Sequence, residues 1–150
     1  MRAAIALAEE SVRSGKGGPF GAVVVRNGII VGQGSNRVTA TNDPTAHAEI
    51  LAIRQAGHHL GTFRLQDCEI YASCEPCPMC LSAIYWARLK KIYYGNTRHD
   101  AAGIGFDDDF IYAQVSLPPA KRALESEQCL REEAQAAFVE WKEKPDKIAY

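Results

Sequence analysis

The chain has 150 residues, of which 47% are hydrophobic and 23% charged, and this is enough for one globular domain with a buried core. Its net charge is −1, whereas a nucleic-acid-binding protein usually carries a basic excess, so the charge favours a small-molecule substrate. Apolar runs such as 21–25 are far too short to cross a bilayer, and we expect no membrane partner.

The N-terminal part predicts a helix followed by a β-hairpin. Apolar residues recur at helical spacing through residues 3–14, and the glycine-rich stretch 15–19 ends that helix. Two β-branched segments, 21–25 and 29–33, are joined by Asn27-Gly28. This dipeptide tolerates positive φ and is typical of a type I′ turn, so we expect an antiparallel hairpin.

A polar loop after the hairpin leads into a second predicted helix. Asp43 can cap this helix, and Pro44 suits its first turn because proline lacks an amide N–H. Gly57 is a suitable C-terminal stop. His47 and Glu49 are therefore expected in or just after the first turn.

A strand over 68–73 is predicted to precede a third helix over 76–87. The stretch Pro-Cys-Pro-Met-Cys at 76–80 marks the start of this helix, because proline is tolerated only in a first helical turn. Cys77 and Cys80 are three residues apart and fall on one face of the helix. A helix N-terminus stabilises thiolates, so the position suits metal ligands.

The rest of the chain predicts one more strand and further helical structure. The strand covers 91–95, a loop rich in glycine and aspartate covers 100–109, a short segment covers 110–115, and helical character extends over 125–142. Strands that alternate with helices predict an α/β protein. We expect a three-layer α/β/α sandwich around a central mixed sheet, in a single domain of residues 1–150.

His47, Cys77 and Cys80 supply the donor set of a catalytic zinc site. Three protein ligands leave the fourth tetrahedral position to water, whose pKa zinc lowers. Glu49 is not needed as a ligand and is placed to carry the proton of that water. H-x-E together with P-C-x-x-C is the signature of zinc-dependent nucleobase deaminases. We therefore predict one zinc ion per chain and hydrolytic deamination with Glu49 as proton shuttle.

Two other interpretations of these residues stay open. The cluster could be a purely structural zinc site. Alternatively, Cys74 and Cys77 form a C-x-x-C after a strand, which is typical of thioredoxin-like redox proteins. That interpretation leaves Cys80, His47 and Glu49 without roles. The five cysteines, three of them clustered around Cys77, suit metal binding in a reducing compartment, so we expect a cytoplasmic protein.

Five motifs cover nearly the whole chain, at 17–22, 42–49, 73–80, 83–88 and 105–112. In these motifs the chain resembles the cytidine-deaminase-like superfamily, and within it the short bacterial guanine deaminases. The first four motifs are shared across the superfamily, and the last, together with the tyrosine at position 150, resembles the guanine branch. The resemblance implies that guanine and water are converted to xanthine and ammonia by attack on carbon 2.

The resemblance also implies how the substrate is held. The three zinc ligands and the proton shuttle keep the roles given above. Asn36 and Asp108 resemble the polar residues that read the purine edge, and Phe20 is a candidate to pack against the ring. The family further implies a homodimer in which the C-terminal segment, about 120–150, is exchanged. Tyr150 would then be part of a lid over the partner's active site.

Other substrates are open within the same fold. Cytosine, the triazine ammeline and a tRNA adenosine are the alternatives to guanine. A tRNA substrate calls for a basic surface, because binding to phosphates depends on lysine and arginine. The balanced charge of this chain therefore disfavours tRNA.

Overall fold

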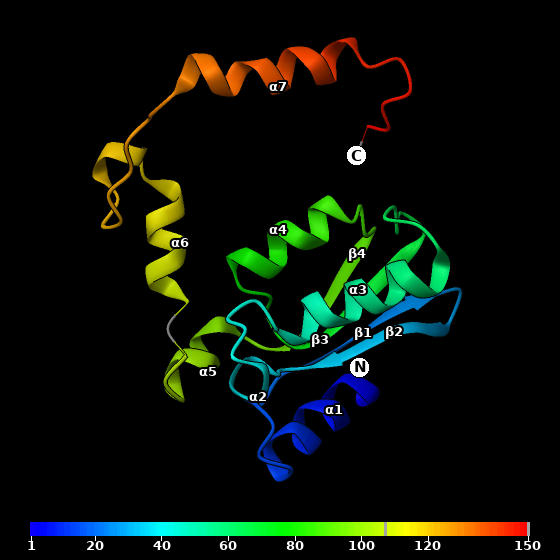
Figure 1. Cartoon of the computed structure of the whole chain (residues 1–150). Helices are drawn as coiled ribbons and strands as arrows, with labels where there is room; N and C mark the ends of the chain where they lie inside the picture. Colours follow the sequence, from blue (N-terminus) through cyan, green and yellow to red (C-terminus); the bar gives the residue numbers. More distant parts are fainter. Residues whose placement is uncertain (107, 150) are drawn as a thin grey trace. The chain divides into compact units, whose positions relative to one another are not determined.

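The computed structural model describes residues 1–106 and 108–149 (Figure 1). The strands are β1 (Gly21–Arg26), β2 (Ile29–Ser35), β3 (Cys68–Cys74) and β4 (Lys91–Asn96). The α-helices are α1 (Arg2–Arg13), α2 (Val38–Thr41), α3 (Ala48–Leu60), α4 (Pro78–Trp86), α5 (Arg98–Gly103), α6 (Asp109–Ser116) and α7 (Arg131–Glu143). Residues Met1–Ile111 form one compact unit and the segment from Tyr112 onward forms a second.

The strands of the first unit form one mixed sheet in the order β2-β1-β3-β4. β1 and β2 are an antiparallel hairpin, and Asn27 and Gly28 have φ values of 51° and 80°, as the type I′ turn requires. β3 runs antiparallel to β1 and parallel to β4. A parallel pair needs a crossover connection, which α4 supplies. The predicted α/β class with a mixed sheet is confirmed.

Helices cover both faces of this sheet: α1 lies on one face, and α3 and α4 lie on the other (Figure 1). The side of α3 that faces the sheet carries Ala48, Ala52 and Ala56, one helical turn apart, and all three are buried. They meet Gly32 and Gly34 of β2, where an added Cβ would overlap backbone atoms of α3. Small residues on both surfaces therefore let α3 lie close against the sheet.

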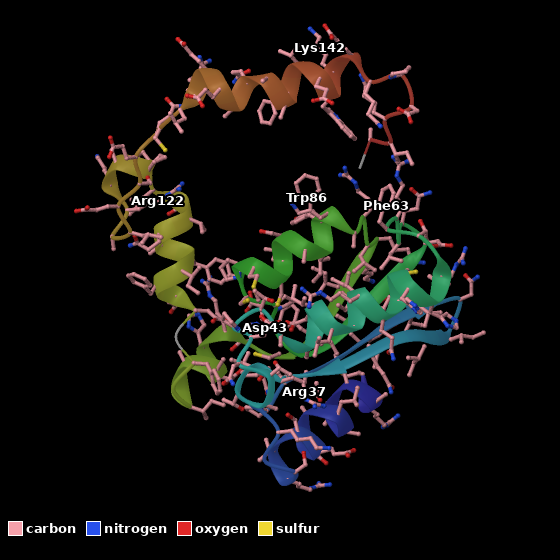
Figure 2. The ribbon with its side chains drawn as sticks, in the orientation of Figure 1. Arg37, Asp43, Phe63, Trp86, Arg122 and Lys142 are labelled. Carbon is pink, nitrogen blue, oxygen red and sulfur yellow. The ribbon has the colours of Figure 1, made fainter. Side chains whose placement is uncertain are left out.

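The core between the sheet and helices α3 and α4 is apolar and buried. Val24 and Ile70 contribute from the strands, Leu65 from the loop before β3, and Ile84 from α4, each at most 2% exposed. Figure 2 shows Trp86 on the outer side of α4, and its side chain is 61% exposed. The inner face of α4 thus belongs to the core while its aromatic outer face does not.

Helix α3 begins and ends later than the sequence predicted. Asp43 does not cap it, because the Asp43 carboxylate accepts hydrogen bonds from the amide and hydroxyl of Thr45, at 2.8 and 2.7 Å, in a separate turn. The helix continues through Gly57 and ends at Leu60, followed by the C-cap residue Gly61, whose φ is 62°. Glycine costs about 1 kcal/mol within a helix, and Leu60, which packs against the core, offsets this cost.

The chain after β4 differs most from the prediction. Helix α5 includes the first residues of the predicted loop over 100–109, and it begins with a capping box between Thr97 and Asp100. The predicted helix over 125–142 begins only at α7, because Leu130 adopts a left-handed conformation with φ 49° just before it. The short segment predicted over 110–115 corresponds to helix α6.

The second unit consists of the end of α6, a 3₁₀ turn η1 (Pro119–Lys121) and α7. Its described residues are held by local contacts: the guanidinium of Arg122, labelled in Figure 2, donates to the carbonyl of Leu117 at 3.0 Å. No residue of α7 is buried, and Phe138 is 71% exposed. Among the described residues, none of the helices is long and apolar enough to cross a membrane.

Candidate active site

Three potential metal ligands meet at one point although they come from different helices. Nδ1 of His47 lies 3.5 Å from Sγ of Cys77 and 3.5 Å from Sγ of Cys80. In tetrahedral zinc sites, with Zn–N near 2.0 Å and Zn–S near 2.3 Å, nitrogen and sulfur donors are about 3.5 Å apart. The donor types and their separation therefore fit one zinc ion.

The N-termini of α3 and α4 position these donors. His47 is the N-cap residue of α3 and Cys77 is the N-cap residue of α4, both with extended backbone. Pro78 follows as the first residue of α4, two positions later than predicted, and Cys80 lies within the first turn. Unpaired amides at helix N-termini favour negative charge, which suits thiolate ligands.

The two thiols differ in their affinity for a proton. The hydrogen bond with the neighbouring Cys80 thiol and, to a smaller extent, that with His47 lower the pKa of Cys77 to about 4. The same contact with Cys77, together with burial, raises the pKa of Cys80. The proton of this pair is therefore held by Cys80 in preference to Cys77, and metal binding would release it.

Glu49 is a buried carboxyl group beside these donors. It is the second residue of α3 and only 7% exposed. Burial raises the pKa of Glu49 above its ordinary value. A buried carboxyl group with a raised pKa holds a proton more readily, so it is suited to take up and release a proton during a reaction.

A cavity of about 320 Å³ opens over the metal donors, large enough for a small ligand. Six of the side chains that the sequence singled out line it: Phe20, Asn36, His47, Glu49, Cys77 and Asp108. Cys80 is fully buried behind them. Tyr150, the remaining candidate, lies outside the described residues.

Comparison with known proteins identifies the family. Residues 1–96 match the model of the cytidine and deoxycytidylate deaminase zinc-binding region. The chain belongs to this family.

The relatives within this deaminase family differ in how much of the chain they match. Guanine deaminase of Bacillus subtilis is 49% identical over 150 residues, which is 100% of this chain and 96% of the relative. Its crystal structure superposes with a TM-score of 0.96 over 99% of this chain and 95% of that one, at 49% identity. A tRNA-specific adenosine deaminase of Agrobacterium fabrum is 47% identical over 77 residues, 51% of each chain.

The cavity wall of this deaminase-family chain also contains residues that the sequence interpretation did not assign. Phe106 packs edge-on against Phe20, with ring centroids 4.8 Å apart. Glu75 and Cys74 contribute from the end of β3, and Thr39 contributes from α2. The motifs at 73–80 and 105–112 contain Glu75, Cys74 and Phe106, but nothing in the sequence points to Thr39.

Cys74 differs from the two candidate ligands in its position and contacts. The donor atoms that meet at one point are those of His47, Cys77 and Cys80, whereas the Cys74 thiol donates a hydrogen bond to the carbonyl of Thr97 at 3.5 Å. Burial raises the pKa of Cys74 to about 11, which makes it a poor nucleophile. Cys74 therefore contributes to the wall of the cavity without joining the metal group.

Two hydrogen bonds orient the Asn36 side chain. Its Oδ1 accepts from the amides of Gly18 and Val38, each at 3.3 Å. The side-chain NH₂ has no acceptor among the described residues, and Asn36 lines the cavity. Asn36 can therefore offer a hydrogen-bond donor to a ligand in this cavity.

Proposed function

We propose that this chain is a zinc-dependent guanine deaminase that converts guanine and water to xanthine and ammonia. The observation that carries the proposal is the 49% identity to the Bacillus subtilis guanine deaminase along the entire chain, including the part beyond the family region at 1–96. The tRNA-specific relative matches only about half of the chain. The balanced net charge also supports a small substrate.

We assign the metal to His47, Cys77 and Cys80. This assignment is supported by the 3.5 Å separations of their donor atoms and by the lowered pKa of Cys77. Zinc, when bound, supplies a Lewis acid that lowers the pKa of water into the neutral range. The role of the protein is to hold three ligands rigidly at two helix N-termini.

Glu49 is the proton shuttle in this proposal. It takes one proton from the attacking water and delivers it to a ring nitrogen, and it then takes the remaining proton of the new hydroxyl group and delivers it to the leaving amine. The oxygen of water becomes the new oxygen on carbon 2, and the exocyclic amine leaves as ammonia. The position of Glu49, buried and in the wall of the cavity, supports this role because the transferred proton is shielded from bulk water.

The substrate contacts are proposed from the chemistry of the cavity wall. Asn36 presents an NH₂ group that can donate to an acceptor on the purine edge, and the Asp108 carboxylate can accept from a ring N–H or amine. Phe20, which is in edge-on contact with Phe106, packs against the purine ring in this proposal. We place Tyr150 at the mouth of the cavity as a lid from a second subunit.

We further propose a cytoplasmic homodimer that exchanges the segment of about 120–150. The exposed aromatic side chains support it: Tyr85 is 71% and Trp86 61% exposed on α4, and Phe138 is 71% and Trp141 46% exposed on α7. A helix such as α7, with no buried residue, depends on packing against another surface for its stability. All five cysteines are free thiols, as expected in a reducing compartment.

The test is ammonia release from a panel of guanine, cytosine, adenine, cytidine, adenosine, ammeline and a tRNA anticodon stem-loop. We expect strong preference for guanine. Glu49→Gln should lower turnover by about 10²-fold or more, as loss of a general acid–base does, while one zinc ion per chain is retained. Release of ammonia only from another base would contradict the proposed substrate.

The same variant separates the deaminase from the two other interpretations. Glu49→Gln with unchanged turnover would indicate that the carboxylate has no catalytic role. A zinc-loaded wild-type protein without activity on any member of the panel would indicate a structural site. Thiol–disulfide exchange activity without bound zinc would favour a redox protein.

A further inference from the structure

The wall of the cavity that carries Phe106 and Asp108 is joined to the metal-binding turn by the side chain of Glu75. β3 ends at Cys74, and Glu75 follows it directly before the turn that contains Cys77. Glu75 lines the same cavity as Phe106 and Asp108. It is the acidic side chain of the metal-binding motif to which neither the sequence nor the proposed mechanism gives a role.

The contacts of Glu75 lead to the start of helix α5. Its amide donates to the carbonyl of Asn96 at 2.8 Å, which extends the pairing of β3 with β4 by one residue. Its Oε2 accepts from the backbone amide of Arg98, the first residue of α5, at 3.1 Å. A carboxylate on an amide at a helix start makes a charge-assisted hydrogen bond, so Glu75 fixes the position of α5 against the end of β3.

Helix α5 in turn contacts one cavity-lining residue, Phe106, and the neighbour of another, Asp108. At its C-terminal end, the amide of Phe106 donates to the carbonyl of Ala101 at 3.0 Å. At its N-terminal end, Nε of Arg98 lies 3.5 Å from a carboxylate oxygen of Asp109, the neighbour of Asp108. The orientation of Phe106 and Asp108 toward the cavity thus depends on where α5 lies.

We propose that Glu75 is a positioning residue for substrate binding, which acts through α5 on Phe106 and Asp108. The inference rests on the proposed function, because it concerns how the same cavity holds its purine. The carboxylate is needed as a hydrogen-bond acceptor for the Arg98 amide, and its charge is not needed as a contact to the substrate. Glutamine keeps an acceptor at the same place, whereas alanine removes it.

This difference defines the experiment. Glu75→Ala should raise KM for guanine by about tenfold with kcat changed less than about threefold, since displaced binding groups weaken binding. Glu75→Gln should recover most of that loss. Hydrogen exchange of the amides in 98–109 should speed up in Glu75→Ala and not in Glu75→Gln, while zinc content stays at one per chain.

A control and a second variant keep the test decisive. Asp67→Ala removes an exposed carboxylate that pairs with Arg26 away from the cavity, and it should leave KM and the exchange of 98–109 unchanged. Arg98→Ala leaves the metal-binding turn intact and removes the contact to Asp109. It should raise KM about threefold, as expected for a half-exposed ion pair. An unchanged KM would refute the proposed path through α5 to Asp108, also where Glu75→Ala does not fold.

The possible results separate this proposal from the proposed function. If wild-type protein releases no ammonia from guanine, the function is wrong, and exchange in 98–109 still tests the positioning role. If Glu75→Ala binds guanine normally with unchanged exchange, the positioning role is refuted. Loss of binding in Glu75→Gln equal to that in Glu75→Ala, with normal exchange, would mean that the charge contacts the substrate directly and would also refute it.

Discussion

The Asn36 side chain shows how backbone contacts determine what a single residue can offer to a ligand. Its amide oxygen is occupied by Gly18 and Val38, and its own backbone amide donates to the carbonyl of Phe20 at 2.9 Å. The residue is only 6% exposed. Because the side-chain oxygen and the backbone amide of Asn36 already have hydrogen-bond partners, the side chain can offer its NH₂ donor to a ligand in the cavity.

Asn36→Asp tests this orientation with almost no change in shape. Aspartate keeps an oxygen for the two backbone amides but replaces the NH₂ donor with a second acceptor. We expect kcat/KM for guanine to fall by about 10²-fold or more, because a buried acceptor on the substrate would lose its partner. Steady-state kinetics measures the loss, and a thermal melt checks that the variant is folded.

Asn36→Ala provides the comparison. It removes the acceptor of two backbone amides as well as the donor, so it should also lower the free energy of unfolding, by about 1–3 kcal/mol per unsatisfied buried group. Full activity of Asn36→Asp would show that the NH₂ group does not contact the substrate.

Among the elements, α3 is the helix whose packing against the sheet most directly positions residues of the candidate site. Its first turn holds His47 and Glu49, and its next turns lie against β2 through small residues. A Cβ at Gly34 would overlap the carbonyl oxygen of Ala48, the residue between the candidate ligand and the candidate shuttle. The distance between sheet and helix therefore affects the metal centre.

Gly34→Ala should displace the N-terminus of α3. We expect a loss of about 1–3 kcal/mol in the free energy of unfolding, as for other overpacked cores, together with weaker zinc binding. Chemical denaturation and a zinc-competition titration measure the two effects. An added Cβ at Gly103 has open space in α5, so Gly103→Ala is the matched control and should not destabilise the protein. Equal stability of both variants would contradict the packing argument.

At the scale of the whole molecule, the chain divides into a unit with a core and a unit without one. Residues up to Ile111 enclose the sheet and its apolar core. From Tyr112 onward, neither α6 nor α7 contains a buried residue. A segment of this kind is stable only when it packs against another surface, which the proposed exchange between subunits would provide.

Removal of the residues after Pro145 tests the lid at this scale. Turnover of guanine should drop while zinc stays bound, because the metal ligands all belong to the first unit. Lys147→Ala, which changes one side chain within the removed stretch, should keep its turnover. Metal analysis, kinetics and the molecular mass in solution are the readouts. Unchanged turnover after the deletion would rule out the lid.

The sequence alone determined those features whose cause lies within a few residues. Asn27-Gly28 specifies its turn through backbone dihedral preferences, and the prolines at 76 and 78 locate the start of α4 to within two residues because proline suits a first helical turn. The donor set of His47, Cys77 and Cys80 with Glu49 beside it could be predicted as well, because zinc chemistry restricts both the residue types and their spacing.

Only the tertiary structure decided features that depend on contacts between distant residues. The start of α3 is a local exception, because Thr45, only two residues after Asp43, occupies the carboxylate that the sequence predicted as its cap. Phe106 reaches Phe20, and Glu75 reaches Arg98, across long stretches of chain. Such contacts depend on how the sheet and helices pack, so the inner wall of the cavity could not be predicted from local patterns.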